Sequence, residues 1–422
     1  MDRLIIENVR CFRGKHEVPL APLTILVGEN STGKSTLLAA ARLAWDLGER
    51  SELNFNEEPF LLGAYDQIAS SSSTDGRPQK LGFGSQEKIQ DGRRSVTTLV
   101  MGNFMAQAAQ PVLRSWRLVA PPFCVKARYG FDERLVSLEA NAPSGSVKMK
   151  PEDFSFLAGP MSPSWVAAFL HDWADDFSQD DRKKLAHFAS VWDKQRGPRP
   201  CAFAPIRTSP QRTYDPIKEI ANPQGGHVPM VLASLHSRSP KEWGHLQAAL
   251  NDFGRAAGLF DEVNVRRLGK SEADPFQLQV RIDGALVNLV DVGYGVSQIL
   301  PILVDCLRGQ EGRMFLLQQP EVHLHPQAQA ELGSFLASLA KRQNKRFLIE
   351  THGDYLLDRI CMDLRDGKHG LRPEDVSLLY FERTGESVQI HSLILNEVGD
   401  IQNAPPGYRR FFLEESRRFL GA

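Results

Sequence analysis

The sequence predicts an α/β protein whose central sheet is mostly parallel and flanked by helices, with an antiparallel β lobe and a helical insertion. In the last third of the chain, apolar runs typical of strands alternate with stretches typical of helices. Strands separated by helices usually pair in parallel and carry the helices on the faces of the sheet. Residues 80–150 instead contain short alternating stretches, and residues 151–200 become helical. A chain of 422 residues is long enough for two or three domains.

The first expected strand and helix lie near the N-terminus. "LTILV" at residues 23–27 is a short apolar run with β-branched residues, which predicts a buried strand. From Lys34, "KSTLLAAARLAWDLG" contains good helix formers and closes on Gly48. Residues 46–80 lose this regularity and pass through "ASSSSTDGRPQK", which predicts a polar loop.

The middle of the chain changes from strands to helices. Stretches such as "SVTTLVM" and "RLVSLEA" predict a small antiparallel sheet within residues 80–150. "SWVAAFLHDWADDF" then places one apolar stripe at helical spacing, made by Val166, Phe169, Leu170 and Trp173. After the loop "APIRTSPQRTYDP", a further helix is expected at about 240–258.

The last third is predicted to hold most of the parallel sheet. Strands are expected at "EVNVRRL", "FQLQVRI", "MFLLQ" and "RFLIET", and helices at "PQAQAELGSFLASLAKR" and "DYLLDRICMDLRD". Pro326 suits the first position of its helix. The buried stripe of that helix is predicted to be Leu332, Phe335, Leu336 and Leu339.

The composition excludes several classes of protein. Lys+Arg 50 against Asp+Glu 51 leaves a net charge of −1, so the overall charge neither favours nor excludes nucleic acid. The five cysteines form no C-x-x-C pair, which argues for a reducing compartment and against a disulfide framework or zinc module. The N-terminal apolar run contains charges, unlike a signal peptide, and the most apolar window, 286–307, is interrupted by polar residues. We expect a cytoplasmic protein that does not enter membranes.

A phosphate-binding motif lies between the first expected strand and helix. "GENSTGKS", from Gly28 to Ser35, matches G-x-x-x-x-G-K-[ST] in the strand–loop–helix setting that the motif requires. Its glycines let backbone N–H groups curl around an anion, and the helix N-terminus adds partial positive charge. In such a loop Lys34 reaches the β- and γ-phosphates and the Ser35 hydroxyl binds Mg²⁺. The motif predicts that the chain binds a nucleotide.

Four further features accompany this motif in a fixed order. "IENVRCF" precedes it, and "LVDVGYGVSQILPIL", "LLQQPEVHLHP" and "FLIETHGD" follow it. Together the five elements resemble the ABC-class ATPase head of the SMC and OLD-like families, whose stand-alone bacterial members often act in anti-phage defence. The resemblance is good over residues 1–45 and 275–422 and loose over 46–270.

This resemblance divides the chain into three segments. Residues 1–150 correspond to the N-terminal half of the head with the P-loop and the β lobe, and residues 261–422 to its C-terminal half. Residues 151–260 lie between them in the position of an insertion. Because they contain no heptads, we expect a compact helical lobe and not a coiled coil.

The resemblance also assigns the ligands and the residues that bind them. It implies ATP and Mg²⁺ at the seam of a homodimer or higher homo-oligomer, where the P-loop of one copy faces the signature region 293–298 of another. The implied nucleotide-binding residues are Gly28, Asn30, Ser31, Thr32, Gly33, Lys34, Ser35 and Thr36 in the P-loop and Gly293, Gly295 and Ser297 in the signature region. Gly293 stands where these heads carry a serine, so backbone N–H groups or the Ser297 hydroxyl must take over its role.

The strand "MFLLQ" departs from the resembling heads at its end. They place there an acid that holds Mg²⁺ through water and a glutamate that polarises the attacking water, whereas this chain has Gln318 and Gln319. The Gln318 carbonyl can still accept a bond from a Mg²⁺-bound water, but it brings no charge. Gln319 can orient a water without accepting its proton. We expect Mg²⁺ to rest on Ser35 and the phosphates, with Gln318 as a weak ligand, and hydrolysis to be slow.

Other residues are expected to replace the missing acid. Glu321 is the first candidate for the catalytic carboxylate, against the alternative that it caps or pairs with the helix that begins at Pro326. Glu350 and Asp354 are further acids nearby. His352 is expected to contact the γ-phosphate, as the switch histidine of the resembling heads does, although a lone histidine is more often a core residue.

Several neighbouring residues have less specific interpretations. His323 and His325 lack a third ligand nearby for a metal site. Arg10 and Arg13 match basic positions near the nucleotide in resembling heads, but surface arginines are common. Gln67 and Gln211 are candidates for the glutamine that couples Mg²⁺ to the second lobe in the resembling heads.

These features leave more than one function open. The first is a slow ATPase that serves as the sensor or regulator subunit of an anti-phage system and controls a separate effector, a nuclease or toxin. The second is an ATP-held scaffold that hydrolyses essentially nothing. A DNA-repair or SMC-like ATPase is less favoured, and so is a nuclease, since the segment after His352 lacks the D-x-D cluster of a Toprim domain. Short basic clusters, such as Arg266 with Arg267, leave DNA open as a partner.

Overall fold

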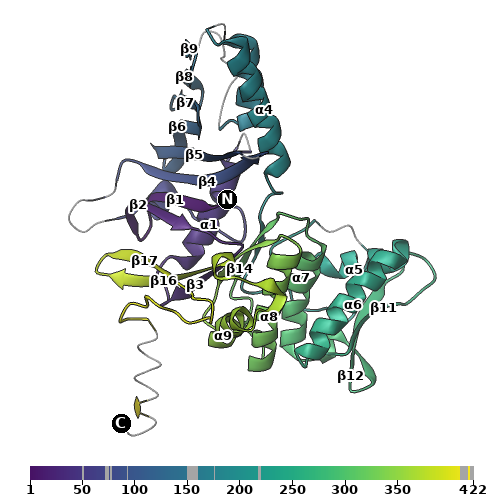
Figure 1. Cartoon of the computed structure of the whole chain (residues 1–422). Coiled ribbons are helices and arrows are strands. Elements are labelled where there is room, and N and C mark those ends of the chain that lie inside the picture. Colours follow the sequence, from purple (N-terminus) through teal and green to yellow (C-terminus); the bar gives the residue numbers. More distant parts are fainter. Residues whose placement is uncertain are drawn as a thin grey trace. The chain divides into compact units, whose positions relative to one another are not determined.

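The computed structural model describes residues 1–49, 52–71, 76, 78–92, 94–149, 160–174, 176–216, 220–408 and 417–418, without the side chain of Trp173 (Figure 1). The chain divides into two compact units. The first contains Met1–Leu20, Gly28–Pro200 and Phe381–His391, and the second contains Ala21–Val27, Cys201–Tyr380 and Ser392–Ala422.

The first unit is built on an eight-stranded antiparallel sheet, ordered β2-β1-β4-β5-β6-β7-β8-β9. In β7 the buried Phe123, Val125, Ala127 and Tyr129 alternate with Cys124, Lys126 and Arg128, so one face of the sheet is apolar. The strands are β1 Arg3–Val9, β2 Phe12–Pro19, β4 Leu81–Asp91, β5 Arg94–Gln107, β6 Gln110–Ala120, β7 Phe123–Tyr129, β8 Leu135–Ala142 and β9 Gly145–Met149.

Helices cover part of this sheet. α1 (Lys34–Asp46) contacts β4, and α3 (Pro163–Trp173) packs on α4 (Gln179–Gln195), which runs beside the sheet (Figure 1). A single turn, α2 (Tyr65–Ile68), lies in the loop after α1. Two N-cap serines begin α3 and α4, because each hydroxyl accepts a backbone N–H of its first turn.

The predicted antiparallel sheet is confirmed but is larger than residues 80–150. β1 and β2 join it, because β1 pairs with β2 on one side and with β4 on the other. The predicted stripe of α3 is confirmed for Val166, Phe169 and Leu170, which are buried. The side chain of Trp173, residues 150–159, where the helical region was expected to begin, and residues 72–75 and 77 of the polar loop lie outside the described residues.

The second unit contains the mostly parallel sheet that the alternation of strands and helices predicted. Its order is β10-β14-β15-β3-β16-β17, and β10, β14, β15 and β3 pair in parallel. All five residues of β14 are buried, as expected for a strand covered on both faces. The strands are β3 Leu23–Gly28, β10 Cys201–Phe203, β14 Met314–Gln318, β15 Arg346–Glu350, β16 Val376–Thr384 and β17 Ser387–Leu393.

Helices and a second, three-stranded antiparallel sheet complete this unit around one hydrophobic core. Side chains of the parallel strands and of all five α-helices contribute to that core. The helices are α5 Val228–Arg238, α6 Pro240–Ala256, α7 Tyr294–Arg308, α8 Pro326–Arg342 and α9 Asp354–Arg365, with the turns η2 Leu289–Asp291, η3 Lys368–Gly370 and η4 Pro373–Asp375. The small sheet consists of β11 Glu262–Arg267, β12 Phe276–Ile282 and β13 Ala285–Asn288.

Most elements expected in the last third are confirmed, among them β14, β15, α8 and α9. Proline is at the start of α8, and Leu332, Leu336 and Leu339 are buried, whereas Phe335 is only partly buried. The three-residue strand β10 gives no periodic signal and was not predicted. Of the helices in the described part of the chain, none combines the length and the hydrophobicity of a membrane span.

The contact between α8 and α9 can be tested at a glycine. A Cβ on Gly333 would lie 2.7 Å from the main-chain oxygen of Leu356, so Gly333→Ala should lower the free energy of unfolding by about 1–3 kcal/mol. Gly244 in α6 has open space around it, so Gly244→Ala should instead raise this free energy, by up to about 1 kcal/mol. Urea unfolding of both variants measures the difference, and a stabilised Gly333→Ala protein would contradict the close helix contact.

Candidate functional site

The P-loop, residues 28–36, has a backbone that requires glycine at two positions. Gly28 has φ 138° and a Cβ there would lie 2.4 Å from the main-chain oxygen of Phe381. Gly33 has φ 90° and a Cβ there would lie 2.5 Å from the Cys11 sulfur. Ser31, at the exposed tip of the loop, also has a positive φ of 60°. The motif glycines are therefore fixed by the local geometry, as the motif predicts.

Lys34 lies inside the curve of this loop and is only 3% exposed. Its ammonium group donates to the main-chain oxygens of Gly28 and Glu29, at 2.9 and 2.6 Å. The Thr32 hydroxyl closes the same turn by donating to Glu29 O at 2.7 Å. Asn30, Ser31 and Ser35 are exposed. The loop thus surrounds a buried positive charge, with Ser31 and Ser35 exposed and Thr32 buried.

Two arginines brace the P-loop. Arg10 donates to the Thr36 hydroxyl at 3.3 Å, to Leu62 O at 3.1 Å and to Gln67 O at 3.4 Å, which ties α1 to the loop around α2. Burial lowers the pKa of Arg10 from its ordinary value. Arg383, which the sequence analysis did not single out, donates to Ser31 O at 2.6 Å.

Arg13 and Gln67 face other groups. Arg13 pairs with Glu386 and donates to Ser71 O at 2.7 Å, so its guanidinium is held by these groups and does not brace the P-loop helix. The Gln67 side-chain oxygen accepts the backbone N–H of Ala64 at 3.0 Å and caps α2. Of the two predicted basic residues, only Arg10 contacts the P-loop helix.

In the second unit, the carboxyl ends of β10, β14, β15 and β3 meet at one edge of the sheet. Gln318 is the last residue of β14 and pairs in register with Glu350 of β15. The next residue, Gln319, has φ 43° and donates its N–H to Glu350 O at 2.8 Å. This left-handed conformation, uncommon for a residue other than glycine, turns the chain sharply at the edge where ligands of such sheets usually bind.

Glu321 follows this turn and is 5% exposed. Its Oε1 accepts the Thr351 hydroxyl at 2.7 Å and the backbone N–H of His352 at 3.0 Å. Its Oε2 is buried and has no hydrogen-bond partner among the described residues. The helix cap that was the alternative for Glu321 is made by His325, which accepts the N–H of Gln327 and caps α8. The structure therefore brings Glu321 to the end of β15, beside His352.

The histidines around Glu321 have separate contacts. His352 is exposed and lies directly after β15, so its backbone holds Glu321 while its ring is on the surface. The His323 ring meets Tyr294 edge-on, with ring centres 4.9 Å apart. Across the described ranges, no three His, Cys, Asp or Glu side chains come together as a metal site.

The signature region forms the start of α7. Gly293 is the N-cap residue, and a Cβ on it would meet no atom within 4 Å. A Cβ on Gly295 would lie 2.6 Å from His323 O, so only glycine lets α7 approach the segment after β14 this closely. The Ser297 hydroxyl donates to Tyr294 O at 2.8 Å, within its own helix. Backbone groups of Gly293 are therefore more accessible than the Ser297 hydroxyl.

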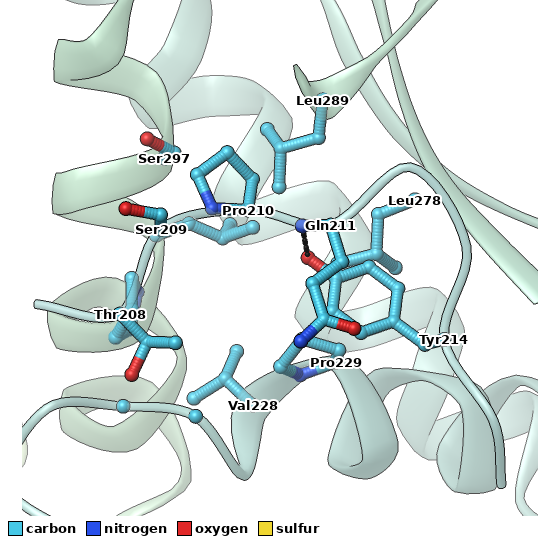
Figure 2. Close-up of a pocket in the computed structure, with 14 residues that line it drawn as sticks. Thr208, Ser209, Pro210, Gln211, Tyr214, Val228, Pro229, Leu278, Leu289 and Ser297 are labelled. Carbon is cyan, nitrogen blue, oxygen red and sulfur yellow. Dashed lines mark hydrogen bonds between the residues drawn. The ribbon is translucent and has the colours of Figure 1, made fainter.

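A pocket of about 60 Å³ lies between the loop after β10 and the side of α7. Figure 2 shows Thr208, Ser209 and Gln211 along this loop, with Ser297 of α7 beside Ser209. The Gln211 backbone N–H donates to the Tyr214 hydroxyl at 2.9 Å, which holds the loop in a turn. Gln211 thus borders this pocket, and its side chain is exposed.

Arg207, just before this pocket, is a site residue that the sequence analysis missed. It is 2% exposed, and its guanidinium donates to Gln318 O at 3.5 Å. Burial lowers the pKa of Arg207 to about 10, although the nearby Glu321 and Tyr294 oppose this shift. The sequence shows only an arginine in a polar, proline-marked segment, which predicts a loop and gives no sign that its side chain is buried.

Two family models match the chain. One, described as "AAA domain, putative AbiEii toxin, Type IV TA system", matches residues 174–358, and another, described as "AAA domain", matches residues 3–78. The match over residues 3–78 includes the P-loop and α1, and the match over residues 174–358 includes the segment from Arg207 to His352. No curated protein matches the chain.

Solved structures of SMC heads are similar to this chain. A Smc head bound to the C-winged helix domain of ScpA has a TM-score of 0.47 at 10% identity, covering 94% of this chain and 98% of that chain. A Smc head with an extended coiled coil, bound to the C-terminal domain of ScpA and derived from Pyrococcus furiosus, has a TM-score of 0.45 at 9% identity and covers 99% of both chains. An SMC head from Thermotoga maritima has a TM-score of 0.41 at 9% identity, covering 93% and 98%.

The geometry of the P-loop can be tested at Gly33. Gly33→Ala places a methyl group against Cys11 and Phe12 at a positive φ, so the loop must distort. We expect the affinity for a fluorescent ATP analogue to fall about 10-fold or more, measured by titration, with the far-UV circular dichroism unchanged. Gly244→Ala serves as the control, and wild-type affinity in the Gly33→Ala protein would show that the loop does not bind the nucleotide in this form.

Proposed function

We propose that this protein binds ATP at its P-loop, hydrolyses it slowly and works as an ATP-dependent homodimer or higher homo-oligomer. The observation that carries the proposal is the environment of Glu321. One oxygen of this buried carboxylate is fixed by Thr351 and His352, and the other has no partner among the residues described. A carboxylate held in this way, at the carboxyl edge of a parallel sheet, suits a general base better than a structural cap.

ATP would be held by the P-loop. Gly28, Asn30, Ser31, Thr32, Gly33, Lys34, Ser35 and Thr36 form this binding set. The turns at Gly28 and Gly33 and the buried ammonium group of Lys34 fit a polyphosphate. Phosphate oxygens would replace the Gly28 and Glu29 oxygens as acceptors for Lys34.

The residues after β14 and β15 would act on the water and the terminal phosphate. Glu321 takes the proton of the attacking water on Oε2, Gln319 orients that water, and the His352 ring contacts the γ-phosphate. Gln319 cannot act as the base, because a carboxamide does not accept a proton at neutral pH. Hydrolysis then depends on one carboxylate that lies two positions beyond the usual place, which is consistent with a slow enzyme.

In this proposal, the protein's donors for Mg²⁺ are neutral oxygen atoms. The exposed Ser35 hydroxyl and the phosphate oxygens would hold it, with Gln318 as a further acceptor. Bound Mg²⁺ neutralises phosphate charge. Because neither Ser35 nor Gln318 brings a negative charge, the side chains of the protein contribute little to the affinity for Mg²⁺.

The signature region supports the proposal of a dimer. The space around Gly293 and the backbone N–H groups at the N-terminus of α7 suit a phosphate supplied by another copy, while Gly295 seats the helix on the loop after β14. We assign Gly293, Gly295 and Ser297 to this contact, in which Ser297 supports its own helix turn.

We place this cytoplasmic ATPase as the sensor or regulator subunit of a bacterial anti-phage system with a separate nuclease or toxin effector. One matching family model has a description that names a type IV toxin–antitoxin system, which supports such a setting. A second candidate function is an ATP-held scaffold without turnover. Gln318 and Gln319 favour it, because neither side chain can replace an acid.

Phosphate release separates these two functions. We expect slow release from purified protein with Mg²⁺ and ATP, and none above background from Lys34→Ala. Glu321→Gln should lower the rate constant about 100-fold or more while ATP binding is kept, because the base is lost and the P-loop is untouched.

Each result has a different meaning for the two functions. Release no higher than that of Lys34→Ala, with ATP retained after desalting, would identify the scaffold. Full activity in Glu321→Gln would exclude Glu321 as the base. Failure of the wild-type protein to bind ATP would exclude both functions.

The weak hold on Mg²⁺ leads to a further prediction. Gln318→Asp adds a negative charge at the end of β14, so the Mg²⁺ concentration for half-maximal phosphate release should fall about 10-fold. Gln310→Asp makes the same change of charge at an exposed position and should leave that concentration unchanged. Equal Mg²⁺ titration curves for the wild type and Gln318→Asp would show that position 318 does not contribute to binding of Mg²⁺.

A further inference from the structure

The first unit contains a pocket of about 200 Å³ that the proposed function does not use. It is lined by residues of the hairpin β4–β5, of the turn between β6 and β7, and of one side of α4. Protein interiors leave few spaces of this size, and an apolar cavity of about 150 Å³ is enough to bind benzene. The pocket is thus large enough for a small organic molecule.

Two hairpins of the antiparallel sheet build one wall of this pocket. Because the strands from β4 to β7 alternate in direction, the turns after β4 and after β6 lie at the same end of the sheet. Ile89 pairs with Val96 in the first hairpin, and Ala120 pairs with Phe123 in the second. Ile89, Ala120 and Phe123 are buried, so this wall is apolar.

α4 builds another wall with side chains outside its buried stripe. The pocket-lining residues of this helix have the spacing i, i+3, i+4 and i+7 of one helix face, and they are Lys184, His187, Phe188 and Val191. The helix buries a neighbouring face, which includes Leu185, whereas Phe188 and Val191 stay partly exposed. The pocket therefore has apolar surface that a ligand can remove from water.

The charged side chains at the pocket differ in whether they have a partner. Asp91 lies opposite Arg94 in the hairpin register, but its Oδ1 is 2.9 Å from Nε2 of His187 and pairs with that ring. The bond from Lys184 to Asp180, 2.5 Å long, raises the pKa of the Lys184 amine, and the nearby charge of Arg94 opposes this rise. The exposed Arg94 guanidinium itself forms no hydrogen bond or ion pair with any residue that the structure describes.

We propose that this pocket binds a small organic acid, with an aromatic or branched apolar body inside the pocket and its carboxylate on Arg94. Ligand sites are mostly apolar and use a few polar groups to fix the orientation of the ligand. A guanidinium group can pair with a carboxylate through two parallel N–H donors.

The local charges favour a carboxylate over a phosphate. Asp91 and Asp180 are near the pocket, and they repel a doubly charged phosphate more strongly than a single negative charge. Arg94 is the cation left to pair with the ligand, since Lys184 and His187 already face acids. The site consists of residues of the first unit outside the P-loop, so this inference does not depend on the proposed function.

The test compares 3-phenylpropionate with its neutral counterpart, 3-phenylpropan-1-ol. Dissociation constants for the full chain are measured by ligand-observed NMR in the absence of nucleotide. We expect a value of about 0.1 to 1 mM for the acid and binding about 10-fold weaker for the alcohol. Arg94→Gln should weaken binding of the acid about 5- to 10-fold and leave the alcohol unchanged, because only the acid uses the guanidinium group.

Two further variants control for the place of binding. Val191→Trp fills the pocket from a partly exposed helix position, so it should weaken both compounds about 10-fold or more with the far-UV circular dichroism unchanged. Arg117 is an exposed arginine on the other face of the same sheet, and Arg117→Gln should change neither dissociation constant.

Several results would overturn the proposal. These are a wild-type protein that does not bind the acid saturably or binds the acid and the alcohol equally, an unchanged affinity for the acid in Arg94→Gln, and full binding in a folded Val191→Trp protein. If Val191→Trp does not fold, the comparison of Arg94→Gln with Arg117→Gln still decides. Failure to bind ATP would bear on the proposed function alone.

Discussion

The parallel pairing of β14 with β15 is the constraint on which the candidate catalytic edge depends. The register sets Gln318 against Glu350, and the ladder continues one residue further through the N–H of Gln319. Only after this pairing is made can Glu321 reach back to the end of β15 and accept bonds from Thr351 and His352. The carboxylate of Glu321 thus joins the segment after β14 to the residues that follow β15.

The charges at this edge form an unusual balance. Gln318 ends β14 and Gln319 follows it, so two neutral side chains stand there. The buried carboxylates of Glu321 and Glu350 lie nearby, and one buried guanidinium lies against the Gln318 carbonyl. The left-handed backbone at Gln319 and His323 adds conformational strain in the same short segment. Strain and unpaired buried charge both lower stability, so their presence together is better explained by a functional site than by packing.

Features that depend on neighbours in the sequence could be predicted. The P-loop is specified within a few residues, because its glycines, lysine and following helix are local. The start of α8 at Pro326 and its leucine stripe were predicted for the same reason. The extent of the antiparallel sheet was underestimated, because β1 also pairs with β4, which lies far along the chain.

The missed site residues depend on distant contacts. Arg207 is buried because the three-residue strand β10 pairs with β14. Neither the length nor the composition of β10 predicts that pairing. Arg383 reaches the P-loop tip from β16, which is near the other end of the sequence. Glu321 could be named as a candidate from its position, but its contacts with Thr351 and His352 became visible only once the sheet was formed.

The hydrogen bonds of Lys34 have a consequence for which anions the P-loop admits. Because the ammonium group is already bonded to the Gly28 and Glu29 oxygens, an incoming anion must replace both bonds and not simply approach an exposed charge. A single sulfate or inorganic phosphate offers few contacts beyond that exchange, whereas a polyphosphate also engages the backbone N–H groups along the loop. In the proposed function, this exchange of hydrogen bonds therefore favours a polyphosphate over a single small anion.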